Sequence, residues 1–481
     1  MKLLKERKIT MYLSNYWSLY SEFIYTFQHL RYRNIPICLM TNFYQQIDDK
    51  LNRLMEQDNF SSHLSNAKIK DMHQIQPFFE HHLQPLKKPL EKKQAGKILI
   101  NLDYIRIPGN KLVQYFSLDK TIILSRSRLS HYLGFPNAYL GKFTSDTKNT
   151  SQELINRAQA IFSQYTHHPA FSNSFFMNTF IQRIPIIVDT LEAVFKLYEQ
   201  TPCSGVLVGT TEDVVSRALA IIGSMKGIPS ICLQHGILMG EEAFIPVFSS
   251  HIAVYGDYEK RWYIKRGMEE KRIAGIGHPR YDAIFEHPSG NKTDYLKKYN
   301  LNPTKKTIVI ATGPHIDELK FNDMMNRLLK NDQYQFLIKP HPWELAKNKI
   351  ALYLKLTQKN PSVQVINDKK ANILDLICHA DAVITSLSTT ALESCLLNKP
   401  VFVYYFLQSN RYYDYFDRLE QHMQSDPAKL VQMISLYFNN QKIRNAYTNI
   451  KKSFLQDSYK PRNASKELIE FLYQLTNVKM N

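Results

Sequence analysis

Five hydroxyl side chains fall within six consecutive positions, residues 385–390, of this 481-residue chain. The apolar run before them predicts a buried strand at 382–385, and the residues after them predict a helix at 389–397. A turn from strand to helix lies at the carboxyl edge of an α/β sheet, where backbone N–H groups favour an anion such as phosphate. A helix cap is the alternative, but a cap needs one hydroxyl and not five. The predicted phosphate ligands are Ser386, Ser388, Thr389 and Thr390.

Two other motifs of the same half follow predicted strands and carry groups suited to phosphate. In Lys339-Pro340-His341-Pro342, the prolines fix the backbone and hold His341 beside the charge of Lys339. In Thr312-Gly313, the glycine lets the backbone approach a phosphate closely. Glu393, on the helix after the hydroxyls, is expected to reach a ribose hydroxyl. Structural proline and glycine turns are the alternatives for the first two motifs.

A second set of candidates lies in the first half of the chain. His235 follows a predicted strand at 228–233 and precedes a glycine, so it is expected at the sheet edge as a general base or as a structural histidine. Arg280 comes after a predicted strand at 272–276 and suits bidentate pairing with phosphate. The alternative is a structural role in the first turn of a helix that starts with Pro279. The acidic candidates, of which the last two are expected to contact a substrate hydroxyl, are Glu212, Asp213, Glu241 and Glu242.

Strands and helices alternate at short spacing on both sides of a predicted linker. This pattern predicts an α/β fold of two Rossmann-like domains, each with a doubly wound parallel sheet, and a ligand cleft between them. The linker is expected near 286–304, where Pro288, Ser289 and Gly290 cluster. The expected division is an N-terminal domain at 1–290 with a helical excursion at 43–95, a C-terminal domain at 291–460 and a C-terminal helix at 461–481.

The start of the chain is expected to add a further βαβ unit to the first domain. Apolar residues predict strands at 8–14 and 35–40, and the segment between them predicts a helix at 15–31. Two long helices are expected at 151–200, before the regular alternation of strands and helices begins.

The composition favours anionic partners. Lysine and arginine total 61 against 43 acidic residues, a net charge of +18, which suits nucleotide phosphates, an anionic membrane surface or nucleic acid. No nucleic-acid-binding motif accompanies the charge, so we expect no nucleic-acid partner. The five cysteines lack zinc-ligand spacing, so free thiols in a reducing cytosol are expected. The N-terminus does not resemble a signal sequence. No run of 18 apolar residues occurs, so a cytoplasmic protein with peripheral membrane contact is the expectation.

Taken together, these motifs resemble those of the GT-B glycosyltransferases of bacterial surface-polysaccharide synthesis. His235-Gly236 and the run from Gly277 to Asp282 are similar to motifs of the CDP-glycerol glycerophosphotransferases. The hydroxyl turn and the segment from Leu396 to Pro400 resemble two further motifs of those enzymes. His341-Pro342 is similar to an element of the capsule Kdo- and polysialyl-transferases. The likeness covers residues 203–406.

The resemblance implies a GT-B transferase without a metal or other cofactor. Such an enzyme moves a sugar or glycerophosphate from a CDP-, CMP- or UDP-linked donor to a hydroxyl of a glycan or lipid-linked acceptor. The second domain then holds the donor, and His235 and Glu241 are the catalytic candidates, with His235 either a base or a phosphate ligand. Gln234 and Leu387 stand where the glycerophosphotransferases carry tryptophan and tyrosine, which leaves the donor open. A sugar-nucleotide 2-epimerase of the same fold and a non-catalytic protein that binds glycan or nucleotide are the alternatives.

Overall fold

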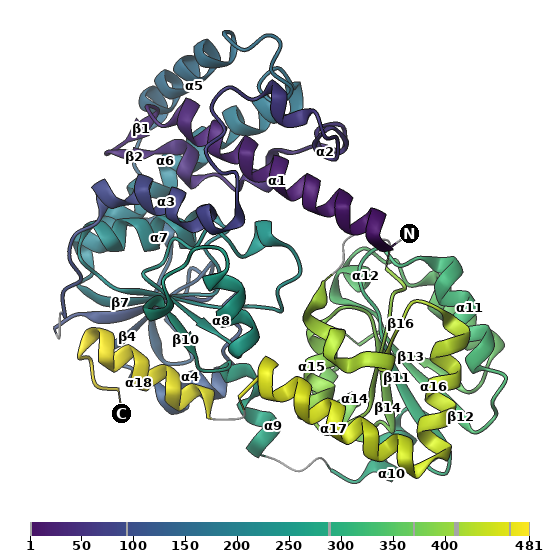
Figure 1. The fold of residues 1–481 in the computed structure, drawn as a ribbon. Helices are drawn as coiled ribbons and strands as arrows, with labels where there is room; N and C mark the ends of the chain where they lie inside the picture. The colour runs from purple at the N-terminus through teal and green to yellow at the C-terminus, as the bar shows by residue number, and fades with distance from the viewer. Residues whose placement is uncertain are drawn as a thin grey trace. The chain divides into compact units, whose positions relative to one another are not determined.

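The computed structural model describes residues 2–92, 95–286, 290–368, 371–407, 413–460 and 463–480 (Figure 1). By its internal contacts the chain divides into two compact units. The first unit holds residues 1–280 and 461–481, and the second unit holds residues 281–460. Pro288 and Ser289 of the predicted linker lie outside the described residues.

The first unit contains an eight-stranded sheet in the order β10-β9-β8-β7-β3-β4-β6-β5. Neighbouring strands are parallel except β5 and β6, which pair antiparallel. Numbered by sequence, the parallel strands from β6 to β9 run 3-2-1-4-5-6, which is the strand order of a Rossmann fold. The strands are β3 (Lys97–Asn101), β4 (Thr121–Leu124), β5 (His131–Tyr132), β6 (Phe135–Ala138), β7 (Cys203–Val208), β8 (Ser230–Leu233), β9 (His251–Val254) and β10 (Ile273–Gly275).

Helices cover both faces of this sheet. In β3, Ile98 and Ile100 join the core cluster that contains Leu468 and Leu472, whereas Leu99 joins the cluster of the opposite face. Because both faces are buried, the strands appear in the sequence as continuous apolar runs. In Figure 1, α4 and α18 lie on one face and α7 lies on the other. The helices are α1 (Lys2–Phe27), α2 (Asp49–Met55), α3 (Ile75–Leu83), α4 (Gly109–Tyr115), α5 (Lys148–Phe162), α6 (Ser174–Gln200), α7 (Val214–Met225), α8 (Asp257–Ile264) and α18 (Ala464–Thr476).

The predicted βαβ unit at the start of the chain is wrong. Residues 8–14 belong to α1, and residues 35–40 hold only the short strand β2 (Ile35–Pro36), followed by a 3-10 turn. β2 pairs with β1 (Arg31–Tyr32) and joins neither large sheet. A helix forms because buried side chains recur every three or four residues along it. These side chains are Tyr16, Leu19, Tyr20, Phe23 and Phe27.

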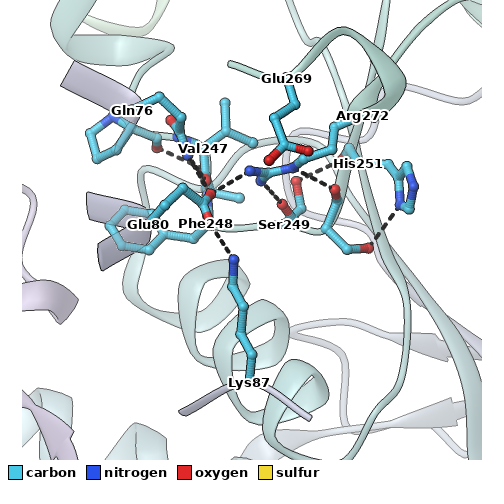
Figure 2. Close-up of polar contacts among 12 residues, drawn as sticks. Gln76, Glu80, Lys87, Val247, Phe248, Ser249, His251, Glu269 and Arg272 are labelled. Atoms are coloured by element: carbon cyan, nitrogen blue, oxygen red, sulfur yellow. Dashed lines mark hydrogen bonds and ion pairs between the residues drawn. The ribbon is translucent and has the colours of Figure 1, made fainter. Parts of the chain in front are cut away.

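A polar network attaches the helical excursion to the edge of the first sheet (Figure 2). Glu80 of α3 accepts hydrogen bonds from Lys87 and from Arg272, which directly precedes β10. Arg272 also donates to the carbonyl of Ser249 at 2.8 Å. Burial raises the pKa of the Glu80 carboxyl, but the two cations more than offset this, so its pKa lies below the usual value. The excursion is therefore fixed to the strands by charge as well as by apolar packing.

The second unit contains a six-stranded sheet of parallel strands in the order β13-β12-β11-β14-β15-β16. Numbered by sequence, this order is again 3-2-1-4-5-6, so the second unit also has the Rossmann strand order. The strands are β11 (Lys306–Ala311), β12 (Tyr334–Lys339), β13 (Val363–Val365), β14 (Ala382–Thr385), β15 (Val401–Tyr404) and β16 (Met423–Gln424).

Two layers of helices enclose this second sheet. One face packs against α11, α13 and α16, and α14, α15 and α17 cover the other (Figure 1). In no part of the chain that the structure describes is a helix both long and apolar enough to cross a bilayer. The helices are α9 (Asp282–Glu286), α10 (Lys292–Lys298), α11 (Glu318–Leu328), α12 (Pro342–Ala346), α13 (Ala351–Lys359), α14 (Ile373–His379), α15 (Thr389–Leu396), α16 (Pro427–Asn439) and α17 (Gln441–Ser458).

Candidate active site

The topology of the second unit brings two of the predicted motifs together. Its strand order reverses between β11 and β14, with Thr312-Gly313 directly after β11 and Ser386 directly after β14. A Cβ atom added to Gly313 would lie 3.5 Å from Ser386 Oγ and 3.0 Å from Leu407. Open α/β sheets bind ligands outside the carboxyl ends of the strands at such a reversal. This reversal point is therefore the candidate ligand site of the second unit.

A buried glutamate that the sequence analysis did not identify holds the reversal point together. Glu344 lies on the first turn of α12 and is 3% exposed. It accepts hydrogen bonds from Thr312 Oγ1 at 2.5 Å, from His341 N at 2.8 Å and from the Tyr353 hydroxyl at 2.7 Å. His341 and Glu344 form a capping box at the helix start. The spacing of these two residues was the signal available in the sequence.

His341 and Lys339 lie at the end of β12, beside this carboxylate. His341 is exposed, and its Nδ1 accepts a hydrogen bond from Trp343 N at 3.2 Å. The neutral ring then carries its proton on Nε2, which is the nitrogen able to donate to a phosphate oxygen. Lys339 donates through Nζ to the Asp368 carbonyl at 2.8 Å, and partial burial lowers the pKa of its ammonium group.

The hydroxyl turn, residues 385–390, contains both the cap of α15 and a residue at the reversal point. Ser388 Oγ accepts a hydrogen bond from Thr390 N at 3.2 Å, so this residue caps α15. Ser386 is buried beside Gly313, whereas Thr389 is partly exposed on the first turn of the helix. Glu393 lies one turn further along and is 1% exposed. Ser388 Oγ also donates to Thr390 Oγ1 at 3.3 Å, so these two hydroxyls have structural partners, and Ser386 and Thr389 stay predicted ligands.

In the first unit, His235 lies at the carboxyl edge of the sheet, after β8. Its Nδ1 is 3.1 Å from the carbonyl oxygen of Gly209. A carbonyl oxygen only accepts, so Nδ1 carries the proton and Nε2 carries the lone pair. The ring stacks on Phe244 with centroids 5.2 Å apart. Burial, and then the charge of Arg106, lower the pKa of His235 to about 4, so the imidazole is neutral at physiological pH.

The loop after β3 supports His235 with a strained backbone. Tyr104 and Arg106 have left-handed φ angles of 62° and 52°. Such angles cost non-glycine residues about 1–3 kcal/mol each and cluster at functional sites. Arg106 Nη1 donates to the carbonyl of His235 at 2.7 Å. A Cβ atom on Gly209 would come within 2.1 Å of the Tyr104 backbone, so only glycine permits this close approach.

The remaining predicted residues of the first unit have structural partners. Glu241 is buried and forms an ion pair with Arg266, whose guanidinium lies over the Trp262 ring at 3.6 Å. Arg280 N donates to Nδ1 of the buried His278 at 3.1 Å. Within the described ranges, no group of three or more His, Cys, Asp or Glu residues is placed to hold a metal ion. The first unit thus carries His235, Glu241 and Arg280, and the other predicted site residues belong to the second unit.

The comparison with protein families supports the resemblance inferred from the motifs. Residues 255–473 match the family model of CDP-Glycerol:Poly(glycerophosphate) glycerophosphotransferase. The match includes Arg280, His341 and the hydroxyl turn, and it begins after His235 and Glu241. The likeness to the glycerophosphotransferases is therefore confirmed over this part of the chain.

Curated relatives align with part of the chain only. A lipid-A-disaccharide synthase of Coxiella burnetii (strain Dugway 5J108-111) is 28% identical over 166 residues, which are 34% of this chain and 41% of that protein. A UDP-N,N'-diacetylbacillosamine 2-epimerase (hydrolyzing) of Legionella pneumophila is 21% identical over 213 residues, 41% of this chain and 55% of that protein. The aligned segments thus span between two fifths and just over half the length of these relatives.

Among solved structures, the UDP-GlcNAc 2-epimerase from Methanocaldococcus jannaschii has a TM-score of 0.50 at 14% identity, covering 79% of this chain and 99% of that chain. The wall teichoic acid polymerase TagF has a TM-score of 0.48 at 14% identity, covering 82% of this chain and 92% of that chain. The likeness to the epimerase shows the fold alone. Together with the Rossmann strand order of both units, it confirms the predicted GT-B fold.

Proposed function

We propose that this protein is a transferase that moves a sugar or glycerophosphate unit from a nucleotide-activated donor to a hydroxyl group in cell-surface polymer synthesis. The main support for this proposal is one observation: the matched segment 255–473 contains the reversal point at which Thr312, Gly313 and Ser386 meet. The family description favours a CDP-linked glycerol donor, and the match to a lipid-A-disaccharide synthase favours a sugar donor. A capsular polymer and a teichoic-acid-like polymer are both compatible with these likenesses.

In this proposal the second unit holds the donor. Backbone N–H groups at the start of α15 and the Nε2–H of His341 donate to the diphosphate, and Lys339 adds a positive charge. Glu393 is 1% exposed, so the predicted contact with the ribose is left out of this proposal. Fixed donors and charges of this kind stabilise the negative charge that develops on the leaving phosphate, so the reaction proceeds without a metal or other cofactor.

His235 acts on the acceptor substrate rather than on a phosphate. Its Nδ1–H is engaged by the Gly209 carbonyl, so Nε2 is the atom that accepts the proton of the attacking hydroxyl. A phosphate oxygen also accepts and is unsuited to that nitrogen. The low pKa weakens the base but keeps the ring unprotonated across the physiological range. Glu241, held by Arg266, supports the loop that follows His235.

Thermal unfolding of the purified protein with CMP, CDP, UDP, GDP or ADP, with and without magnesium, tests the proposal. A nucleotide present at 100 times its Kd stabilises the protein by about 2.7 kcal/mol, which raises Tm measurably. A rise with a cytidine nucleotide supports transfer of glycerophosphate, Kdo or sialate, and a rise with UDP supports transfer of a hexose. No rise with any nucleotide favours a non-catalytic protein and overturns the transferase.

A sugar-nucleotide 2-epimerase is the second candidate. The alignment of 213 residues with the Legionella pneumophila epimerase favours it. Such an enzyme converts its substrate without an acceptor, so incubation with UDP-N-acetylglucosamine alone distinguishes the two reactions. Formation of the 2-epimer, followed by NMR, would replace the transferase assignment.

We further propose that the protein works at the cytoplasmic face of an anionic membrane. The β5–β6 hairpin at the edge of the first sheet exposes Leu129 to 71% and Leu133 to 49%. The surrounding stretch 106–142 carries six basic residues and one acidic residue, and all of the basic residues except the buried Lys111 reach the surface. Apolar side chains rimmed by cations suit the interface of an anionic bilayer. Sedimentation with phosphatidylglycerol vesicles should pull down the protein but not its L129S/L133S variant, and equal recovery of both would contradict this contact.

A further inference from the structure

A cavity of about 300 Å³ with a mixed polar and aliphatic lining lies in the first unit, between residues 40–45, α6 and the start of α7. This volume is at the lower end of the range of small-molecule sites. Residues 212–214, which follow the end of β7 by four residues, form one wall. β7 is the strand next to β3 at which the strand order of the first sheet reverses. Residues 40–45 and α6 form the other walls. We call this cavity the excursion pocket, and its polar lining side chains include Asn42, Gln45, Arg183, Glu212 and Asp213.

The excursion pocket contains hydrogen-bond donors and acceptors side by side. Asn42 Nδ2 donates to Glu212 Oε1 at 2.6 Å, and Arg183 Nη2 donates to Gln45 Oε1. Asp213 Oδ1 caps α7 through a hydrogen bond of 2.9 Å. Its Oδ2 is buried and has no hydrogen-bond partner among the described residues. A buried carboxylate oxygen without a donor is costly, but this oxygen is closed to solvent, so Glu212 is the carboxylate that we assign to a ligand.

The charge and apolar lining of the pocket select a class of ligand. Two acidic residues and one arginine line the pocket, a charge balance that opposes a nucleotide diphosphate. Ile186, Ile187 and Val214 add an aliphatic surface, and Ile186 is 57% exposed. Sugars offer hydroxyls that donate to carboxylates and accept from guanidinium or amide groups. Their C–H faces also pack against aliphatic side chains.

Glu212 connects the excursion pocket to His235. The same side chain lines a second, smaller cavity of about 20 Å³ together with His235 and Glu242. That volume holds one water molecule. A sugar in the excursion pocket would therefore lie one carboxylate away from the histidine of the sheet edge.

We propose that the excursion pocket binds the sugar end of the acceptor substrate, with Glu212 accepting a hydrogen bond from one of its hydroxyls and Arg183 donating to another. The assignment of this sugar as the acceptor rests on the proposed transferase function, whereas the pocket itself rests on its geometry. All of its lining residues precede position 255, so they lie outside the segment that matches the glycerophosphotransferase family.

Saturation-transfer NMR on the full chain, with free glucose, galactose and N-acetylglucosamine as probes, tests the pocket. At least one sugar should receive saturation, and its Kd should rise about tenfold or more in R183A and in E212Q. I186W should also weaken binding by filling the mouth of the pocket, at a position exposed enough to keep the fold intact. The matched control is R157A on α5, where the arginine contacts Glu153 and the His29 carbonyl away from the pocket. It should bind as the unaltered protein does.

Three results would overturn the pocket: no saturation of any sugar, the same Kd in R183A, E212Q and I186W as in the unaltered protein, or displacement of the sugar by a nucleotide. The two proposals fail in different ways. Sugar binding without any nucleotide-induced rise in Tm would remove the transferase and keep the pocket. A nucleotide-induced rise in Tm without sugar binding would keep the transferase and remove the pocket.

Discussion

Replacing Glu344 by alanine tests whether the reversal point of the second sheet depends on one buried carboxylate. The carboxylate accepts three hydrogen bonds, at 2.5 Å from Thr312, 2.8 Å from His341 N and 2.7 Å from Tyr353. Its removal takes the acceptor from the Tyr353 hydroxyl and leaves the other two donors only longer bonds, from Thr312 Oγ1 to the Lys339 carbonyl at 3.5 Å and from His341 N to Thr312 Oγ1 at 3.3 Å. The position is 3% exposed. The same change leaves the strands and their order untouched.

The expected cost follows from the number and kind of these bonds. A hydrogen bond to a charged group contributes about 1.5–3 kcal/mol, and water entering the vacated space recovers part of the loss. We therefore expect E344A to lower the free energy of unfolding of the second unit by about 3–5 kcal/mol. Tyr353→Phe removes one bond and should cost about 1–2 kcal/mol. In the E344A background the same change should cost almost nothing, because the hydroxyl has already lost its acceptor.

Tryptophan fluorescence can follow the second unit by itself. The chain has three tryptophans, and Trp343 is the single one within residues 281–460. The difference in emission between a protein and its W343F counterpart during urea unfolding therefore reports the second unit. Gln358→Ala, an exposed change on α13, is the matched control and should stay within about 0.5 kcal/mol of the unaltered protein.

Two results would refute this reasoning. One is an E344A variant that unfolds within about 1 kcal/mol of the unaltered protein, which would mean that solvent replaces the carboxylate without cost. The other is additivity of E344A and Y353F, since independent effects would show that the Glu344–Tyr353 bond does not contribute.

Four further predictions follow from the same contacts. His341→Ala should abolish donor turnover while costing only about 1 kcal/mol in urea unfolding through loss of the α12 cap, and full turnover would contradict the donor site. The rate should not depend on His235 titration above pH 5 and should fall near pH 4, where the ring becomes protonated. The unfolded state binds this proton more readily, with a pKa of about 6.5. The stability that neutral His235 contributes should therefore be complete above about pH 6.5 and be lost as the pH falls to its pKa of about 4. Because the pKa of the Glu80 carboxyl is lowered, its carboxylate should contribute fully to the free energy of unfolding above its ordinary pKa of about 4.3 and lose that contribution in stronger acid. Arg272→Ala should reduce this acid dependence of urea unfolding. Ser388→Ala should cost about 1 kcal/mol in urea unfolding through loss of the helix cap, and no change would show that water replaces the hydroxyl.

The second unit could be predicted closely because each of its elements carries a local signal. β14 and β15 are apolar runs that begin after Asp381 and Pro400, and the predicted strands at 307–311 and 334–338 coincide with β11 and β12. The strand order has no such local signal. The meeting of Gly313 with Ser386 across the reversal point therefore became visible only in the structure.

The start of the chain shows why a short window misleads. Ile9, Met11 and Leu13 alternate with polar or aromatic neighbours, which fits the period of a strand over these few residues. A window extended to Phe27 contains buried residues such as Tyr16 and Phe23 at helical spacing, and that longer pattern governs the structure. Burial against α6 and the excursion stabilises the helix, and neither partner can be located from the local sequence.

The role of His235 rests on a contact that no local pattern contains. Its residue type alone allowed a base, a phosphate ligand or a structural histidine. The bond from Nδ1 to the Gly209 carbonyl removes the phosphate role, because it places the lone pair on Nε2. That bond joins residues 26 positions apart, and Arg106, which donates to the His235 carbonyl, lies 129 positions away. The Arg106 contact requires the loop after β3 to approach Gly209 within the reach of a missing side chain. Gly209→Ala should therefore displace that loop, raise the pKa of His235 and shift the acid limb of the rate profile upward. An unchanged pH profile in G209A would show that the histidine is positioned by other contacts.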